Sequence, residues 1–556
     1  MKKKVTLALP LFALSLAASG CDFSLHLSIN SSSDSSAASD SQSASVPDWD
    51  YVAPTSDTGY YKATEVNKTV NFHKVGKHSA NPTLPSTGTP KILVLPIGFS
   101  NPAYAFTDKR LADIQTAVSG TAEETKYWES LKSYYATSSY GKLDMDFVFA
   151  DPYIAATTPM EFYRVNKNTV FFEYDNLRYT YEDKPEALPQ LAMQKAIEQY
   201  QAGGGDTTQF DSDKDGFIDA VIMVYSCHNS TNDFLLKDEK YGDLFWAYQY
   251  SDMSVTEVDG DVASPIGNRY FWASYDFFYE GVSEGKGVDA HTLIHEMGHI
   301  LGADDYYNYA EGERAEPSGC LMMMSNNIAD HDIFSKLSYS WVEPYVVTGD
   351  CTITINPSNS GGDCILLADS WNGTCFDEFV IFELYTPDRL NQLDSTKAYH
   401  GKTKALSQAG VRAFHIDNRL VFANNNDPES GRPTGAVFLS DGQVNHFDEF
   451  VSVILKKGDF VAQGVTNTAY YDASVCQGRG YELIQIIQAD GVNTTRNGTV
   501  SVNADLFQSG DTFSLSSHNA FFSNRDKLNN GNDLPYEVTF DSVSATSATL
   551  SFRKVS

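Results

Sequence analysis

Cysteines, basic residues and membrane-length apolar runs are all scarce in this chain. It has seven cysteines in 556 residues, and no two stand in the Cys-x-x-Cys spacing of cysteine zinc sites and redox motifs. Lysine and arginine number 40 against 72 acidic residues, and the formal net charge of −32 would repel nucleic acid and anionic membrane surfaces. We therefore expect no nucleic-acid partner and no cysteine-based zinc or redox site.

The N-terminus has the pattern of an export signal. Lys2–Lys4 supplies positive charge, and the apolar stretch Val5–Ala18 is too short to span a bilayer. Small residues then precede Cys21, as in a bacterial lipoprotein signal, where this cysteine carries the lipid; an ordinary secretory signal cut nearby is the alternative. We expect residues 1–20 to be the signal peptide and the protein to be extracellular, held at the bacterial membrane only through lipid on Cys21.

Composition divides the rest of the chain into four parts. Residues 21–49 are serine-rich with almost no large apolar side chains, which predicts a disordered tether. Residues 50–90 are irregular and form either an N-terminal arm or a pro-segment. Residues 91–345 alternate strand-like and helical patterns, which is typical of an α/β (α+β) catalytic domain. Residues 346–556 carry short β-branched or aromatic runs between Asn/Gly/Asp turns, which predicts an all-β sandwich-like domain.

Individual strands and helices follow from the same patterns. In the first region they predict strands at Lys91–Phe99, Leu143–Phe149 and Ala220–Ser226, and helices near Trp128–Tyr135 and Glu186–Gln201. In the second region they predict strands at Cys351–Ile355, Phe379–Phe382, Gly410–Asp417 and Ala548–Phe552.

One segment carries the spacing of a catalytic zinc site. His295 and His299 are four residues apart in a His-Glu-x-x-His motif within an apolar, helical pattern. On a helix this spacing places both imidazoles on one face, where both can bind one zinc at about 2.0–2.1 Å. Glu296 is placed to act as general base for a zinc-activated water. A buried helix with two hydrogen-bonded histidines and a surface glutamate is the alternative interpretation.

A third ligand is expected just beyond this helix. Gly302 can adopt a positive φ and end the helix, so that the chain turns back and presents Asp305; the adjacent Asp304 is the alternative. Three protein ligands leave the fourth position of a zinc ion for water, as in catalytic sites. A methionine cluster at Leu321–Met324 follows about twenty residues later, as in zincins with a methionine-containing turn beneath the metal.

A second motif has the spacing of a calcium loop. The aspartates stand at positions where a calcium-binding loop carries its carboxylate ligands; they are Asp211, Asp213, Asp215 and Asp219. The carbonyl of Phe217 supplies a further oxygen ligand. Position 12 is Ile222 rather than glutamate, and a strand follows, so the segment is not an EF-hand. We expect a structural calcium ion here; a solvated acidic turn is the alternative.

Several motifs in this order resemble the immune inhibitor A-like zinc metallopeptidases of bacteria. The similar segments lie within about Lys91 to Phe552; they are Tyr134–Leu143, Asp211–Asp219, His295–Tyr307, Met323–Ser325 with Phe334–Leu337 and Trp341, Phe414–Asp417 and Leu506–Asp511. The chain departs from the family at Ser340, at Ala303-Asp304 and at Phe245–Gln249, and none of these departures removes a proposed zinc ligand or the base. The resemblance implies a metzincin-like zinc endopeptidase domain with Met324, or else Met323, as the Met-turn residue.

The predicted activity is hydrolysis of peptide bonds in extracellular proteins by a monomeric zinc metalloendopeptidase. Tyr306, Tyr307 and Tyr339 are candidates for stabilising the oxyanion. Phe271–Tyr275 is either a strand that pairs with an extended substrate or part of the sheet core. The alternative function is a catalytically weak surface adhesin, or a lipoprotein that binds glycan or host protein, built on a protease scaffold.

Overall fold

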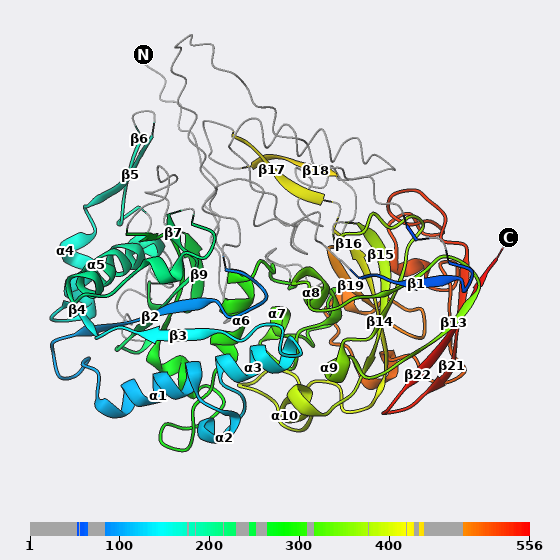
Figure 1. Ribbon diagram of the computed structural model, residues 1–556, viewed down its shortest axis with the longest axis horizontal. Helices are drawn as coiled ribbons and strands as arrows, with labels where there is room; N and C mark the ends of the chain where they lie inside the picture. Colours follow the sequence, from blue (N-terminus) through cyan, green and yellow to red (C-terminus); the bar gives the residue numbers. More distant parts are fainter. Residues whose placement is uncertain are drawn as a thin grey trace, which may run out of the picture.

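The computed structural model describes residues 53–54, 56–64, 84–174, 177–183, 185–214, 216–229, 244–251, 264–307, 316–375, 377–418, 420–426, 433–438 and 482–555. The predicted signal 1–20, Cys21, the predicted tether 21–49 and Asp215 lie outside these residues. The described chain is a mixed α/β protein with several sheets (Figure 1). None of its helices combines the length and the apolar character needed to cross a membrane.

The first sheet is built mainly from parallel strands. Its order is β3 (Asp146–Phe149), β2 (Lys91–Phe99), β8 (Val221–Tyr225), β11 (Arg269–Ser274) and β9 (Tyr248–Ser251), and β4 (Tyr153–Ala156) also pairs with β2. Only the pairing of β9 with β11 is antiparallel. The strand predicted at Lys91–Phe99 has these bounds in the structure, and all its residues after Lys91 are buried.

Helices cover both faces of this sheet. One face packs on α1 (Asp108–Ser119), α3 (Leu131–Ser138) and α6 (His291–Ile300). The other face packs on α4 (Pro159–Asn166) and α5 (Leu188–Ala202). Because strand side chains alternate between faces, the apolar run of β2 contributes to both cores.

Helix α3 starts later than its sequence pattern predicts. The side chain of Ser130 accepts a hydrogen bond from the backbone of Ser133 and caps the helix, so Trp128 lies before it. Trp128 is still buried, against the same core. The apolar spacing that predicted a helix from Trp128 therefore reflects packing rather than helical conformation.

The second sheet joins six strands from distant parts of the chain. In order across the sheet they are β1 (Tyr60–Lys62), β12 (Tyr345–Val347), β14 (Cys364–Leu367), β15 (Glu378–Tyr385), β16 (Gly410–Asp417) and β19 (Ile484–Ile487). A third sheet has the order β13 (Cys351–Ile355), β22 (Ala548–Lys554), β21 (Tyr536–Val543) and β20 (Thr512–Phe513). The second and third sheets share a core, in which the Phe382 ring lies 6.0 Å from the Phe552 ring.

The second sheet is buried on its other face as well. Ile381 and Phe414 lie in the same core cluster as α3 and α6 of the first region. The two predicted domains therefore share a hydrophobic core, and Figure 1 shows their helices and sheets side by side. The predicted boundary between residues 345 and 346 falls inside β12, so the structure does not divide the chain at that point.

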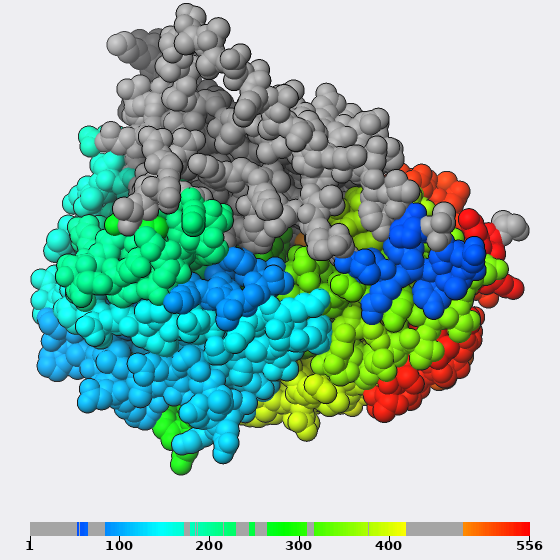
Figure 2. Space-filling view, in the orientation of Figure 1, coloured from blue at the N-terminus to red at the C-terminus, as the bar shows by residue number. Residues whose placement is uncertain are grey.

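The described part of the predicted arm joins this second sheet. Strand β1 pairs antiparallel with β12, and the rings of Tyr60 and Tyr345 lie 5.9 Å apart. Figure 2 shows residues 53–64 in dark blue on the surface beside the C-terminal sheets. This segment therefore extends a sheet of the C-terminal region and does not form a separate unit.

The remaining helices and paired strands are short. They are α2 (Ala122–Thr125), α7 (Met323–Asn326), α8 (Ile333–Ser338), α9 (Ser358–Gly361), α10 (Gln392–Thr396), β5 (Val170–Tyr174) with β6 (Leu177–Thr180), β7 (Phe217–Ile218) with β10 (Ile266–Gly267), and β17 (Leu420–Asn426) with β18 (Pro433–Phe438). Helices α9 and α10 interrupt the C-terminal region that was expected to be all β. They are four and five residues long, too short to leave a periodic signal in the sequence.

Candidate metal centre

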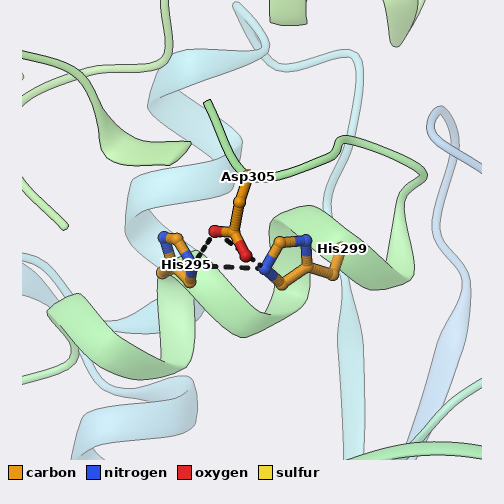
Figure 3. Close-up of side chains that lie close together, drawn as sticks. All are labelled: His295, His299 and Asp305. Atoms are coloured by element: carbon orange, nitrogen blue, oxygen red, sulfur yellow. Dashed lines mark hydrogen bonds and ion pairs between the residues drawn. The ribbon is translucent and has the colours of Figure 1, made fainter. Parts of the chain in front are cut away.

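Helix α6 carries the two predicted imidazole ligands. All ten of its residues, His291–Ile300, are buried. Gly302 has a φ of 103°, as the sequence predicted for the end of this helix, and its N–H donates to the carbonyl of His299 over 2.9 Å. The turn that follows brings Asp305 back over the helix, so that the three side chains converge (Figure 3).

The three converging side chains are within reach of one small cation. His295 Nε2 lies 3.1 Å from His299 Nε2 and 3.0 Å from Asp305 Oδ1, and His299 Nε2 lies 3.5 Å from the same oxygen. Two ligands of a tetrahedral zinc, each about 2.1 Å from the ion, are themselves about 3.4 Å apart. The observed separations therefore fit a metal ion at the centre of the group.

Hydrogen bonds on the far side of each imidazole set its tautomer. His295 Nδ1 lies 2.8 Å from the carbonyl oxygen of Met323, and His299 Nδ1 lies 2.9 Å from that of Ala303. A ring nitrogen that faces a carbonyl must carry the proton, so both Nε2 atoms present lone pairs to each other and to Asp305. These donors fit a zinc ion, since neutral imidazole and carboxylate are ligands that zinc prefers.

Asp305 rather than Asp304 belongs to this group. The Asp305 side chain is fully buried, and its Oδ1 lies 3.0 Å from His295 Nε2 and 3.5 Å from His299 Nε2. Asp305 therefore places a carboxylate oxygen next to two imidazoles in the protein interior. Asp304 is also buried, but its charge instead contributes to the raised pKa values of Tyr306 and Tyr339.

Glu296, the predicted general base, follows His295 on the same helix. It is only 1% exposed, and its carboxylate lies outside the group of three potential ligands. Burial raises the pKa of Tyr135, and the nearby Tyr339 and Glu296 raise it further. The surface position of the alternative interpretation is therefore wrong, and Glu296 lies inside the protein on the helix that carries His295 and His299.

The methionine cluster lies beneath α6. The Met323 carbonyl accepts the His295 hydrogen bond, and the Met324 carbonyl accepts one from Tyr306 N–H over 2.8 Å. A Cβ atom built on Gly298 would overlap the sulfur of Met324, so the thioether packs directly against the helix backbone. Both residues predicted for the Met-turn therefore contact α6. The Met323 carbonyl bonds to His295, and the Met324 side chain packs against the helix backbone.

Two buried tyrosines hold the backbone of α6 at the residues before each histidine. The hydroxyl of Tyr135 donates to the Ile294 carbonyl over 2.7 Å, and that of Tyr339 donates to the Gly298 carbonyl over 3.0 Å. Burial raises the pKa of both tyrosines well above the ordinary value, so they remain protonated donors. His331 Nε2 lies 3.2 Å from the Tyr135 hydroxyl.

Sequence analysis assigned no role to Tyr135 or His331. The sequence showed only that Tyr134–Leu143 and Phe334–Leu337 resemble family motifs. That resemblance does not indicate what the individual side chains do. In the structure these segments touch each other, since Lys336 Nζ donates to the Tyr140 hydroxyl over 3.1 Å. They form the support on which α6 rests.

Two of the three candidate oxyanion donors are used inside the protein. Tyr339 donates to the Gly298 carbonyl, and the Tyr306 hydroxyl lies 3.0 Å from Ser335 Oγ. Tyr307 is the most exposed of the three, at 9%. Tyr307 therefore stays the candidate among them, and its role stays a prediction.

The predicted calcium loop brings three of its carboxylates together. Asp211, Asp213 and Asp219 each offer an oxygen, and these oxygens lie within 4.8 Å of one another. Burial raises the pKa of Asp219 to about 8, and the charges of Asp213 and Asp211 add to this effect. A cation would relieve that cost, because it favours the ionised carboxylate.

The turn of this loop has the backbone conformation that its sequence predicts. Gly216 has a φ of 92°, and its N–H donates to Asp211 over 3.0 Å. Phe217, whose carbonyl was the fifth predicted ligand, begins strand β7, which pairs with β10. The loop thus precedes β8 and anchors the approach to the centre of the first sheet.

The segment Phe271–Tyr275 belongs to the sheet core. Strand β11 pairs with β8 on one side and with β9 on the other, and its residues Arg269–Ser274 are all buried. Both edges are hydrogen-bonded from Tyr270 to Trp272, so an extended substrate cannot pair with that part of the strand, and Tyr275 begins the 3-10 helix that follows. Arg269, at its start, instead donates to the His299 carbonyl over 3.3 Å and so contacts the end of α6.

Comparison with known proteins adds no assignment. Neither a scan of protein-family models nor a search of curated proteins returned a match to this chain. The resemblance to immune inhibitor A-like enzymes therefore stays a prediction that rests on the motifs in the sequence.

Proposed function

We propose that this protein is a metzincin-like zinc metalloendopeptidase, similar to the immune inhibitor A-like enzymes, that hydrolyses peptide bonds of extracellular proteins. The observation that carries the proposal is the convergence of His295, His299 and Asp305 beside a buried helical Glu296. Two imidazole lone pairs and a carboxylate oxygen repel one another at 3.0–3.5 Å unless a cation or proton lies between them. A divalent ion meets that requirement with chemistry suited to hydrolysis.

Zinc held by these three side chains would lower the pKa of water and polarise the scissile carbonyl. Glu296 accepts the proton as water attacks that carbonyl, and then passes it to the leaving amine, so that the glutamate is restored. The position of Glu296 on α6, directly after the potential ligand His295, supports this role. The hydroxyl groups of Tyr135 and Tyr339 keep α6 fixed during the reaction.

The proposal includes two further elements from the sequence. Lipid on Cys21 would hold the enzyme at the outer surface of a bacterial membrane. A calcium ion bound by Asp211, Asp213 and Asp219 would fix the loop before β8, which the raised pKa of Asp219 supports.

Digestion of casein and of a peptide library by the full chain tests the proposal. We expect cleavage that a zinc chelator abolishes, that added zinc restores, and that Glu296→Ala lowers by at least about a hundredfold. Glu123→Ala, which removes an exposed glutamate from α2, is the matched control and keeps full activity. Unchanged cleavage by Glu296→Ala would rule out Glu296 as the base.

The same variant separates the enzyme from a surface adhesin. Removing residues 346–556 would not do so, because the second sheet shares its core with α6 and the remainder would not fold as in the intact protein. Glu296→Ala leaves the fold and the ligands in place. An adhesin would bind its protein or glycan target equally well with and without Glu296 and would cleave nothing in either form.

A further inference from the structure

The first residue of α6, His291, has an environment unlike that of an ordinary core residue. Its imidazole is fully buried and stacks on Trp128 on one face and Tyr399 on the other, with ring centroids 4.0 and 4.2 Å away. Its Nδ1 lies 2.6 Å from Asp289 Oδ1, and its Nε2 lies 3.5 Å from Asp394 Oδ2. We call these five residues the His291 clamp.

The clamp holds a buried cation. Burial by itself would lower the pKa of His291, but Asp289 and Asp394 raise it to about 9, so the ring is an imidazolium at neutral pH. Tyr127, whose ring centroid is 6.0 Å away, and the stacked Tyr399 are further titratable groups that face it, and burial and nearby acidic residues raise the pKa of both. A cation between two aromatic faces and two carboxylates is favourably placed.

The clamp joins three distant parts of the chain. His291 starts α6, Asp394 lies in α10, and Trp128 precedes α3. The same Oδ2 atom of Asp394 also accepts a hydrogen bond from the Ala329 N–H over 2.7 Å, in the loop that follows α7. Asp394 therefore connects the start of α6 to the segment that carries Met323 and Met324.

His291 also lies on the metal-binding side of its helix. His291, His295 and His299 are spaced four residues apart, so they form one stripe along α6. A side chain that is stacked on both faces and held through Nδ1 by Asp289 resists rotation or sliding of the helix at that point. Because the helix is rigid, the same restraint applies to the imidazoles one and two turns further on.

We infer that His291 is a positioning residue, which fixes the rotation of α6 against α10 and thereby sets the geometry of the site formed by His295, His299 and Asp305. The inference rests on the proposed zinc site. An apolar side chain could fill the same space, but it could not make the Nδ1 ion pair with Asp289 or attract the Asp394 carboxylate. The clamp should therefore affect metal affinity beyond its effect on stability.

Zinc affinity of the full chain, measured by competition with a chromophoric chelator, tests this inference without relying on activity. His291→Gln keeps a polar side chain but removes the cation, and Tyr399→Leu removes one stacking ring. Tyr399→Phe keeps that ring and removes only the hydroxyl group, which interacts with Glu280 and Thr292. Arg412→Met is the matched control, because it breaks the buried ion pair with Glu383 in the second sheet, away from the clamp.

We expect His291→Gln and Tyr399→Leu each to weaken zinc binding by about tenfold or more, as substitutions around metal ligands do. Tyr399→Phe and Arg412→Met should stay within about twofold of the wild type, since distant sites act independently. The visible spectrum of the cobalt-substituted protein should change in the first pair of variants and not in the second.

The possible results separate the inference from the proposed function. If the wild type binds zinc and cleaves protein, but His291→Gln and Tyr399→Leu bind zinc no worse than Arg412→Met, the clamp is only structural and the inference is wrong. If the wild type binds no zinc, both the proposed function and the inference are wrong. Should His291→Gln not fold, the two Tyr399 variants decide.

Discussion

Breaking the buried ion pair between Lys336 and Asp330 should destabilise the support beneath α6, the helix that carries His295 and His299. Lys336 is 1% exposed, and its Nζ donates to Asp330 Oδ2 over 2.6 Å and to the Tyr140 hydroxyl over 3.1 Å. Asp330 in turn accepts a hydrogen bond from Ser138 over 2.6 Å. The substitution Lys336→Met keeps the length of the side chain and leaves the Asp330 carboxylate buried beside one hydroxyl.

The expected loss of stability arises from the Asp330 carboxylate, which stays buried without its ion-pair partner. Removing one partner of a buried pair costs about 3–5 kcal/mol, because the other charge stays desolvated without compensation. Asp330→Asn should cost a similar amount by stranding the ammonium group. The double variant removes both charges and should lie within about 2 kcal/mol of the wild type, so the two substitutions couple by about 3 kcal/mol or more.

Urea unfolding followed by tryptophan fluorescence, with chelator present to remove any contribution from bound metal, measures these losses. Lys195→Met is the matched control, because it breaks the exposed pair with Glu198 and should cost less than about 1 kcal/mol. Losses from Lys336→Met as small as those of the control, or additive losses in the double variant, would refute the reasoning.

Three other predictions follow. The pKa of His291 is raised to about 9, above the unfolded value of about 6.5, so its contribution of about 3 kcal/mol is complete below pH 6.5 and lost through pH 9. The stability difference between wild type and His291→Gln should shrink over that range, and a constant difference would contradict this. Calcium at a hundredfold excess over its Kd should stabilise the wild type by about 2.7 kcal/mol, and Asp219→Asn should abolish the gain. Gly298→Ala should destabilise by about 1–3 kcal/mol through overlap with Met324, despite its better helix propensity, and this cost should shrink when the same substitution is made in a Met324→Ala background; a more stable Gly298→Ala would contradict the packing.

The local features of the metal centre were predictable from the sequence. The i, i+4 spacing of His295 and His299 and the positive φ of Gly302 depend only on neighbouring residues, and both hold in the structure. The bounds of β2, β13 and β16 were also predicted, because turn residues stop each apolar run. These signals lie within a few residues of the features that they predict.

Contacts between distant segments left no such signal. The side chain of Asp394 lies against His291 from a hundred residues further along the chain, and nothing in its local sequence distinguishes it from a surface aspartate. Glu383 and Arg412 are ordinary charged residues in the sequence, yet they form a buried ion pair across β15 and β16. Such pairs depend on which strands become neighbours, which only the folded chain defines.

The burial of both faces of the second sheet could not be predicted from the sequence for a related reason. Strand β15 is buried at all eight positions although it contains Glu378 and Glu383, so its pattern is neither that of a half-exposed strand nor that of a purely apolar one. One face contacts the third sheet and the other the core of α6. The change in composition at residues 345 and 346 lies within β12, and residues on both sides of it contribute to one core.

The most direct test of the account is the anomalous scattering of crystals of the full chain, measured at the zinc absorption edge. The account predicts one peak at about 2.0–2.1 Å from each of His295 Nε2, His299 Nε2 and Asp305 Oδ1. No peak in zinc-supplied crystals, or a peak bound by other residues with these three side chains apart, would contradict it.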